Sequence, residues 1–167
     1  MSIYAASVPT FVQMLNSLSA VLDKAENHAA AKKIAPEVLP TSRLYPDMLP
    51  LTRQVQIACD FAAKTTARLT QADIPTTPDT ETTIPDLRAR IAKAIDYLKG
   101  FKPEQFNGAD SREVTFPVGP GTNMTLKGQL YLHHYAMPNF YFHVVTAYDI
   151  LRHNGVEIGK RDFLGSI

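Results

Sequence analysis

Apolar residues recur at helical spacing along most of this chain. They occupy every third or fourth position from Phe11 to Ala25, and again from Leu51 to Leu69 and from Ile84 to Leu98. Such spacing places apolar side chains on one face of a helix, where they can be buried together. The pattern therefore predicts three amphipathic helices in this part of the chain.

The limits of the first helix are indicated by residues that start or stop helices. Ser7 can accept a hydrogen bond from the backbone of a first turn, and Pro9 is tolerated at that end of a helix. Pro36 and Pro40 cannot continue a helix, because proline lacks the backbone N–H group. We expect Ser7 to cap this helix, and the helix to fade near Ala35.

The third helix carries signals at both ends. Thr83 precedes it, Asp86 follows three residues later in a spacing related to the capping box, and Gly100 is placed to end it. The segment from Thr70 to Thr83 contains the turn formers and prolines of a connecting loop. The sequence therefore predicts a helix that begins just after Thr83 and stops before Gly100.

The spacing of apolar and polar residues changes in the segment Ser111–Lys127. Side-chain types alternate there around a centre of glycine and proline, which indicates a short hairpin or two extended arms. Pro117 and Pro120 would confine this segment to an edge or a loop. A fourth helical region follows at about Leu126–Asn154, and Pro138 should kink it or divide it.

Together these elements predict an all-α fold, an antiparallel four-helix bundle with a short β excursion between the third and fourth helices. The chain length suits a single domain over residues 1–167. The 17 Lys and Arg are scattered among 16 Asp and Glu, so we expect neither nucleic-acid nor membrane binding. No signal peptide is evident and no apolar stretch approaches the ~18 residues of a membrane span, which predicts a cytoplasmic protein. Cys59 is the only cysteine, which excludes an intramolecular disulfide.

His143 lies near the centre of the core-facing stripe of the fourth helix, one turn after Asn139. A buried imidazole needs a hydrogen-bond partner or a metal, because an unpaired one costs on the order of 1–3 kcal/mol. On the second helix Gln54 flanks the apolar face, Asp47 near its start shares that side, and Gln56 points away. Two interpretations stay open: a buried, neutral histidine bonded to Asn139 or Gln54, and a histidine that binds a ligand or a metal.

The opposite side of the fourth helix is apolar as well. Its residues lie within about 40° of the helix back: Leu130, Met137, Tyr141, Val145 and Tyr148. A helix that is apolar on both sides is usually buried on both sides. The β excursion could cover this surface, or two copies could pack the backs of their fourth helices together. We expect the homodimer.

Three segments of the chain carry a resemblance to a known family. Ser42–Leu69 contains "RLYPDM", Thr80–Leu98 reads "TETTIPDLRARIAKAIDYL", and Pro138–Gly165 contains "PNFYFH" and "IGKRDFLG". Over nearly its whole length the chain resembles an uncharacterised bacterial family, a domain of unknown function within the DinB-like superfamily.

This resemblance implies a fold, an assembly and a metal site. Members of the superfamily are four-helix bundles, often dimers, and many hold a divalent metal on three histidines. One ligand comes from the second helix and two come from an HxxxH pair on the fourth. His143 precedes the Leu-Arg-x-x-Gly helix end and so takes the second position of that pair, Asn139 takes the first, and the second-helix ligand falls at or near Gln54. Two of the three ligands would then be amides, which are poor ligands for zinc or nickel.

Three functions follow as hypotheses. The first is a DinB-like protein with a degenerate metal triad, no cofactor and no enzymatic activity, which binds a small ligand or a partner at a polar pocket around His143. The second is a metal-dependent thiol S-transferase, the activity of some relatives toward bacillithiol or mycothiol, with His143 as a ligand of a divalent metal. The third is a structural or stress-associated dimer without a small-molecule site. Metal content separates the first two, and a sealed pocket at His143 favours the third.

Overall fold

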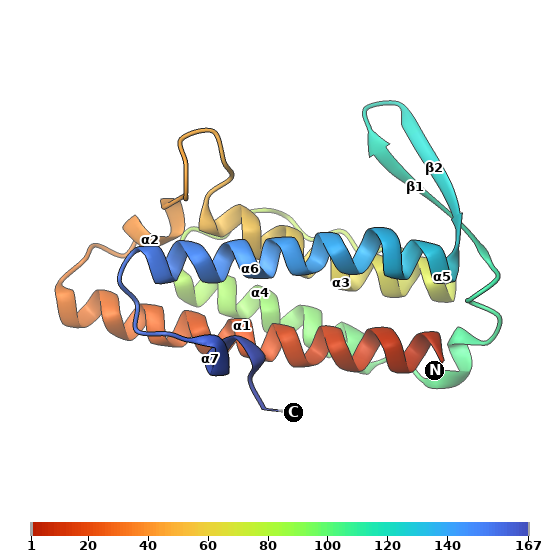
Figure 1. The fold of residues 1–167 in the computed structure, drawn as a ribbon, viewed down its shortest axis with the longest axis horizontal. Coiled ribbons are helices and arrows are strands. Elements are labelled where there is room, and N and C mark those ends of the chain that lie inside the picture. Colours follow the sequence, from red (N-terminus) through yellow and green to blue (C-terminus); the bar gives the residue numbers. More distant parts are fainter. Residues whose placement is uncertain (1, 167) are drawn as a thin grey trace.

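The computed structural model describes residues 2 to 166, and helices dominate it (Figure 1). The long helical elements are α1 (Ile3–Lys32), α3 (Leu51–Thr70), α4 (Ile84–Lys99) and α6 (Met137–His153). The shorter elements are α2 (Val38–Thr41), a 3-10 turn (Pro103–Phe106), α5 (Gly128–Leu130), a π-helical stretch (Tyr131–Ala136) and α7 (Lys160–Leu164). A two-stranded antiparallel sheet is formed by β1 (Glu113–Gly119) and β2 (Thr122–Lys127).

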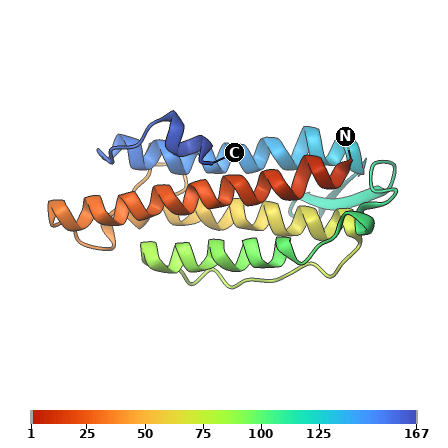
Figure 2. The ribbon, with the colours of Figure 1, turned by 90° about the horizontal axis from the view of Figure 1, so that it is seen from below.

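The four long helices lie side by side along the longest axis of the molecule (Figures 1 and 2). The pairs α1 and α4, and α3 and α6, run in opposite directions, whereas α3 and α4 run in the same direction (Figure 2). The extended loop from Gln71 to Thr83 makes this possible, because it can span roughly 40 Å and a helix of 20 residues is only about 30 Å long. The prediction that all neighbouring helices are antiparallel is therefore wrong for α3 and α4.

The start of α1 differs from the sequence-based prediction. The hydroxyl of Ser2 caps the helix by accepting a hydrogen bond from the backbone N–H of Ala5, at 3.2 Å. The prediction that Ser7 is the cap is wrong, because Ser7 lies buried inside the helix and its hydroxyl donates to the carbonyl of Ile3 at 2.6 Å. Pro9 also lies inside α1. The helix begins five residues earlier, where Ser2 offers the same capping chemistry as Ser7.

By length and hydropathy alone, α1 could cross a membrane, so the expectation that no stretch approaches a span does not hold. Half of the window that passes this test is buried inside the structure. The core helix of a globular domain passes the same test, and Phe11, Leu15 and Leu22 of α1 are fully buried. The helix therefore serves as one wall of the core.

The predicted limits of α4 are confirmed. Thr83 and Asp86 form a reciprocal capping box, in which the hydroxyl of Thr83 accepts from the Asp86 N–H at 3.3 Å. The Asp86 carboxylate accepts from the Thr83 N–H at 3.0 Å. The helix ends at Lys99, directly before Gly100. Two backbone donors that have no partner within the helix are thereby satisfied.

The β excursion is a hairpin that packs one face against the helices. Val114 and Phe116 of β1 are buried, and the ring of Phe116 lies 4.7 Å from that of Tyr131 and 4.4 Å from that of Tyr135. The chain enters the last helix through Gly128, where an added Cβ would lie 1.9 Å from the carbonyl oxygen of Ala109. Only glycine fits this close approach of two backbones.

The last helical segment stays helical from Gly128 to His153, so Pro138 does not divide it. The π-helical stretch Tyr131–Ala136 lies directly before this proline. A π-helical stretch changes the backbone hydrogen-bond spacing, which accommodates a residue that has no N–H group to donate. It also rotates the residues before it relative to those after it, so a single helical repeat does not describe the whole segment.

A single cluster of buried apolar side chains includes residues from α1 to the segment after α6. Phe11 of α1 and Phe140 of α6 meet edge to face at 4.8 Å in this core. The C-terminal α7 packs on the outside of α1, where Lys24 and Asp162 form an ion pair at 2.6 Å. The core thus joins α1 to α6 directly, and α7 closes the outer side of α1.

Candidate functional site

The antiparallel packing of α3 and α6 brings Gln54 opposite His143. The Nδ1 atom of His143 lies 2.7 Å from Oε1 of Gln54, and the amide Nε2 of Gln54 donates to the carbonyl of Leu49 at 3.0 Å. Because the amide nitrogen is the donor to Leu49, the amide oxygen is the acceptor, and Nδ1 of His143 carries the proton. The neutral imidazole therefore presents Nε2 as a hydrogen-bond acceptor.

Aromatic side chains flank the imidazole of His143. The ring of Phe61 stacks on it with centroids 6.0 Å apart and an interplanar angle of 20°, and Phe142 meets it edge to face at 5.2 Å. The prediction of a buried His143 is wrong, because the side chain is only half-buried. Its neighbour Phe142 is exposed, which places His143 at the margin of the core-facing stripe.

The charge state of His143 follows from its surroundings. Partial burial, and then the nearby positive charge of Arg53, hold the pKa of His143 below its ordinary value of 6.5. Asp47 is exposed, and within residues 2–166 it forms no hydrogen bond or ion pair with His143. The imidazole is therefore neutral at pH 7, as the sequence predicts.

Asn139 does not take part in this pair. Its side-chain amide donates to the carbonyl of Tyr135, one turn earlier, at 2.7 Å. Of the four candidate site residues, the structure joins His143 to Gln54 and leaves Asn139 and Asp47 outside that hydrogen bond.

The positions that the resemblance implies as metal ligands do not fit a transition metal. The oxygen of Gln54 is bonded to His143 itself, and the amide nitrogen of Asn139 is bonded within its own helix. Amides are also weak ligands compared with imidazole or thiolate. In the described part of the chain, no three His, Cys, Asp or Glu side chains converge on a point that could hold a metal ion. These positions therefore support no metal-dependent step.

A cavity of about 200 Å³ lies beside the His143–Gln54 pair, between α3, the start of the last helix and the hairpin. Its walls are Ile57, Asp60, Phe61, Lys64, Arg68, Pro117 and Tyr135. Phe61 lines this cavity and also stacks on His143. Arg68 donates to the hydroxyl of Tyr131 at 3.1 Å, while its buried Nε has no hydrogen-bond partner within residues 2–166. The cavity thus combines aromatic walls with a half-buried arginine whose Nε atom is buried.

The side of α3 that faces α4 holds a charged network that the sequence-based prediction missed. Arg90 of α4 is only 3% exposed. Its guanidinium lies 2.8 Å from Asp60, 3.1 Å from Asp79 and 3.2 Å from Glu81, and it donates to the carbonyl of Pro78 at 3.1 Å. These contacts fasten the Gln71–Thr83 loop to both α3 and α4.

Gln56 belongs to the same network. It lies on the side of α3 away from the His143 face, but it is buried there, and its amide donates to Glu81 at 2.8 Å. Burial acts to raise the pKa of Glu81, but the bonds from Gln56, its own backbone and Arg90 outweigh it and hold the pKa below 4.5. One signal in the sequence could have revealed this network. Arg90 lies three residues after Leu87 and four before Ala94, within the apolar stripe of α4.

Comparisons with known proteins agree with this architecture. Residues 3–164 match the model of a family described as a domain of unknown function, DUF1993. The chain is also similar to the crystal structure of a DinB family member from Shewanella denitrificans, with 46% sequence identity and a TM-score of 0.92. That match covers 99% of this chain and 93% of the other. A search of the curated proteins finds no match. The predicted resemblance is confirmed: the chain belongs to the DUF1993 family, and its fold is DinB-like.

Proposed function

We propose that this protein is a DinB-like four-helix bundle that works without a metal and binds a small organic acid between α3 and α6, beside His143. The observation that carries this proposal is the relay from Leu49 through Gln54 to His143, with hydrogen bonds of 3.0 and 2.7 Å. It fixes an imidazole, with Nε2 as the free acceptor, at a position where the resemblance implies a metal ligand. Binding rather than catalysis is the expected activity.

The charges beside the cavity support an acidic ligand. Lys64 is paired with Asp60 at 2.7 Å. Arg68 bonds only to the neutral hydroxyl of Tyr131, and no ion pair to Arg68 occurs within the described residues. Its positive charge is therefore not compensated locally, and its buried Nε–H lacks an acceptor. A carboxylate would supply both the charge and the acceptor.

The walls of the cavity support an aromatic or branched apolar body on that acid. Phe61, Tyr135 and Pro117 present apolar surfaces. The volume of about 200 Å³ exceeds the ~150 Å³ that accommodates a benzene molecule in an apolar cavity. His143 stacks on the far side of Phe61 and does not itself line the cavity, so it senses the ligand through that ring. The proposed ligand thus carries a carboxylate on an aromatic or branched apolar body.

Titration with phenylacetate tests this proposal. We expect saturable changes in the side-chain NMR signals of Arg68 and His143, and binding at least tenfold weaker in Arg68→Gln. Arg88→Gln is the matched control, because Arg88 is a half-exposed arginine of α4 that pairs with Asp23 and Glu26. The proposal fails if phenylacetate does not bind saturably, or if Arg68→Gln binds it as tightly as the control.

Elemental analysis separates this proposal from a metal-dependent thiol transferase. We expect less than stoichiometric zinc, nickel or iron in the dialysed protein, since His143 is the sole imidazole among the three implied ligand positions. A full equivalent of any of these metals that depends on His143 would favour the transferase.

We also propose that the protein forms a homodimer through the back of α6. Three of the predicted interface residues are 36–47% exposed: Leu130, Tyr141 and Val145. The hairpin does not cover them, because it packs on Tyr131 and Tyr135 instead. Two further residues predicted for this interface are covered within the chain instead. Met137 is buried in the core, and Tyr148 packs against Phe163 at 5.8 Å.

The dimer proposal is tested by sedimentation at tens of micromolar. The wild-type chain should sediment as a dimer, and Tyr141→Glu with Val145→Glu should give a folded monomer, because both side chains are exposed and their replacement leaves the core intact. Lys127→Glu, an exposed charge change on β2, serves as the control. A monomeric wild-type protein would end the dimer proposal without affecting the ligand proposal.

A further inference from the structure

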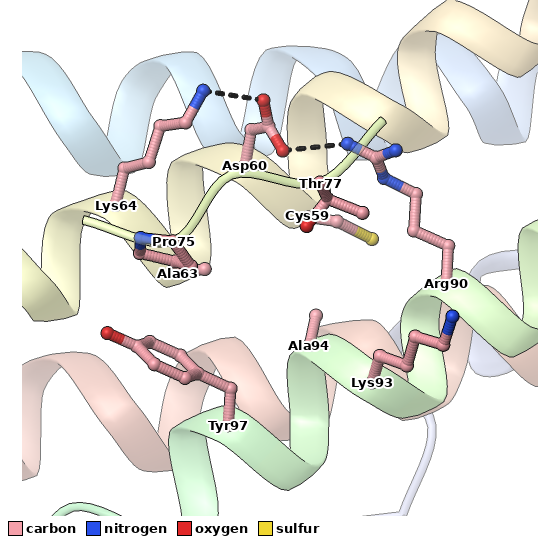
Figure 3. Close-up of a pocket in the computed structure, with 10 residues that line it drawn as sticks. All are labelled: Cys59, Asp60, Ala63, Lys64, Pro75, Thr77, Arg90, Lys93, Ala94 and Tyr97. Carbon is pink, nitrogen blue, oxygen red and sulfur yellow. Dashed lines mark hydrogen bonds and ion pairs between the residues drawn. The ribbon is translucent and has the colours of Figure 1, made fainter. Parts of the chain in front are cut away.

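We infer that the protein has a second ligand site, between α3 and α4, for a small neutral molecule that carries a carbonyl or amide oxygen on a compact apolar body. The site is a cavity of about 180 Å³ beneath the Gln71–Thr83 loop (Figure 3). Asp60 and Lys64 of α3 line both this cavity and the one toward α6, and they separate the two. Its residues are independent of His143, Gln54 and Arg68.

The loop forms a roof that is fastened on both sides of the cavity. The hydroxyl of Tyr97 donates to the carbonyl of Asp73 at 3.3 Å, and Arg90 donates to the carbonyl of Pro78 at 3.1 Å. Between these two anchors, Pro75 and Thr77 line the cavity. The roof therefore crosses the space between α3 and α4 without filling it.

Small side chains leave the space open below the roof. Ala63 of α3 and Ala94 of α4 line it, and the side chain of Tyr97 closes one end (Figure 3). Cys59 also contributes to the wall, but burial raises the pKa of its thiol to about 12. The thiol stays protonated at neutral pH and does not act as a nucleophile. The walls are therefore suited to a compact apolar body held without a covalent bond.

The polar group offered to a ligand is the Nε–H of Arg90. Figure 3 shows the Arg90 side chain reaching from α4 toward Asp60 of α3, past Cys59. The Nη atoms of Arg90 are engaged by Asp60, by Glu81 and by the loop, whereas its buried Nε has no hydrogen-bond partner in the described chain. A buried donor without an acceptor is unfavourable, so an oxygen atom in the cavity would be stabilised there.

The charge balance around Arg90 favours a neutral acceptor over an anion. The ion pairs of this network join three cations to three carboxylates: Arg53, Lys64 and Arg90 to Asp60, Asp79 and Glu81. A carboxylate placed against Nε would add a fourth negative charge to a balanced cluster. This differs from the groove between α3 and α6, where no carboxylate within the described residues pairs with the positive charge of Arg68. Lys93 also lines the cavity, but its side chain is exposed.

Titration with benzamide tests the site, because benzamide combines a ring of suitable size with a neutral amide oxygen. The readout is the Nε–H signal of Arg90 in the NMR spectrum of the full chain. Ala94→Leu should fill the cavity while keeping the Arg90 side chain and its ion pairs, and Ala92→Leu is the matched control, because Ala92 is exposed on the same helix. If Ala94→Leu does not fold, Ala63→Leu is used in its place, because it fills the same cavity from α3.

We expect benzamide to shift the Arg90 Nε–H signal saturably in the wild type, in Ala92→Leu and in Arg68→Gln. Binding should be at least tenfold weaker in Ala94→Leu, and benzoate should bind the same site at least tenfold more weakly than benzamide. The inference is overturned if the signal does not respond, which would mean that water alone satisfies Nε. It is also overturned if benzoate binds as well as benzamide, or if filling the cavity changes nothing.

Discussion

The two sides of α3 use polar groups in different ways. Toward α6, Gln54 forms one hydrogen bond of 2.7 Å with a half-buried, neutral His143. Toward α4, Asp60 and Glu81 both form ion pairs with Arg90, whose charged side chain is only 3% exposed. A charge can remain buried only if neighbours compensate it, whereas a group at the margin stays neutral at small cost. We therefore expect the α4 side to determine stability and the α6 side to respond to pH and ligands.

The largest effect should come from removing the buried charge of Arg90. Arg90→Met leaves Asp60, Asp79 and Glu81 without their common partner and releases the loop at Pro78. Breaking such a buried network from one side costs about 3–5 kcal/mol. Urea unfolding of the variant should show this loss in the free energy of unfolding.

Arg88→Met is the control for that measurement. Arg88 lies on the same helix and pairs with Asp23 and Glu26, but its side chain is 38% exposed. Exposed ion pairs of this kind contribute less than about 1 kcal/mol. Equal losses in the two arginine variants would contradict the distinction between the two sides of α3.

Acid should weaken the α4 side through Glu81. The pKa of Glu81 is held below 4.5 in the folded protein, so its stabilising contribution is complete above 4.5 and is lost as the pH falls through the lower folded value. The difference in unfolding free energy between the wild type and Glu81→Gln should be about 2 kcal/mol at pH 7 and should shrink below pH 4.5. A difference that stays constant between pH 7 and pH 3 would show that Glu81 is not coupled to Arg90.

Much of the helical framework could be predicted from the sequence, because local signals decide it. The stripes of α3 and α4, the capping box at Thr83 and the hairpin before the last helix all depend on residues close together in the chain. The relative direction of α3 and α4 could not be predicted, since it depends on the path of the loop rather than on either helix. The division predicted at Pro138 does not occur, because the neighbouring π-helical stretch accommodates the proline.

The candidate site could be predicted only in part, for a similar reason. Helical spacing placed His143 and Gln54 on facing helices, and the structure joins them. The degree of burial of His143 could not be predicted, because the packing of Phe61 and Phe142 decides it. Arg90 was missed because its partners come from α3 and from the loop, which no local pattern connects to α4.

A smaller effect is expected from breaking the neutral pair on the α6 side. Gln54→Met removes the acceptor for Nδ1 of His143 and the donor to Leu49. A neutral hydrogen bond contributes about 1 kcal/mol, and a half-buried imidazole can turn to water, so the loss in unfolding free energy should be about 1 kcal/mol. Gln129→Met, at an exposed position, should change it by less than about 0.5 kcal/mol. A loss in Gln54→Met as large as in Arg90→Met would overturn the proposed difference between the two sides.

The smallest effect concerns Arg53, which links the two sides electrostatically. Arg53 pairs with Asp79 in the charged network, and its positive charge also lowers the pKa of His143. Arg53→Gln should therefore raise the pKa of His143 toward 6.5, because it removes that charge and leaves Asp79 less compensated. Arg152→Gln, an exposed change farther along α6, should leave the pKa of His143 unchanged because solvent and salt screen it.

The sign of the linked stability effect follows from the direction of the shift. The folded protein holds the pKa of His143 below 6.5, so the unfolded chain binds the proton more readily, and protonation of this residue weakens folding as the pH falls below 6.5. Above 6.5 His143 is neutral in both states and contributes no pH dependence. NMR titration of the imidazole in the wild type and both arginine variants measures the coupling directly. If Arg53→Gln leaves the pKa of His143 unchanged, the two sides of α3 are electrostatically independent, and partial burial alone keeps the imidazole neutral.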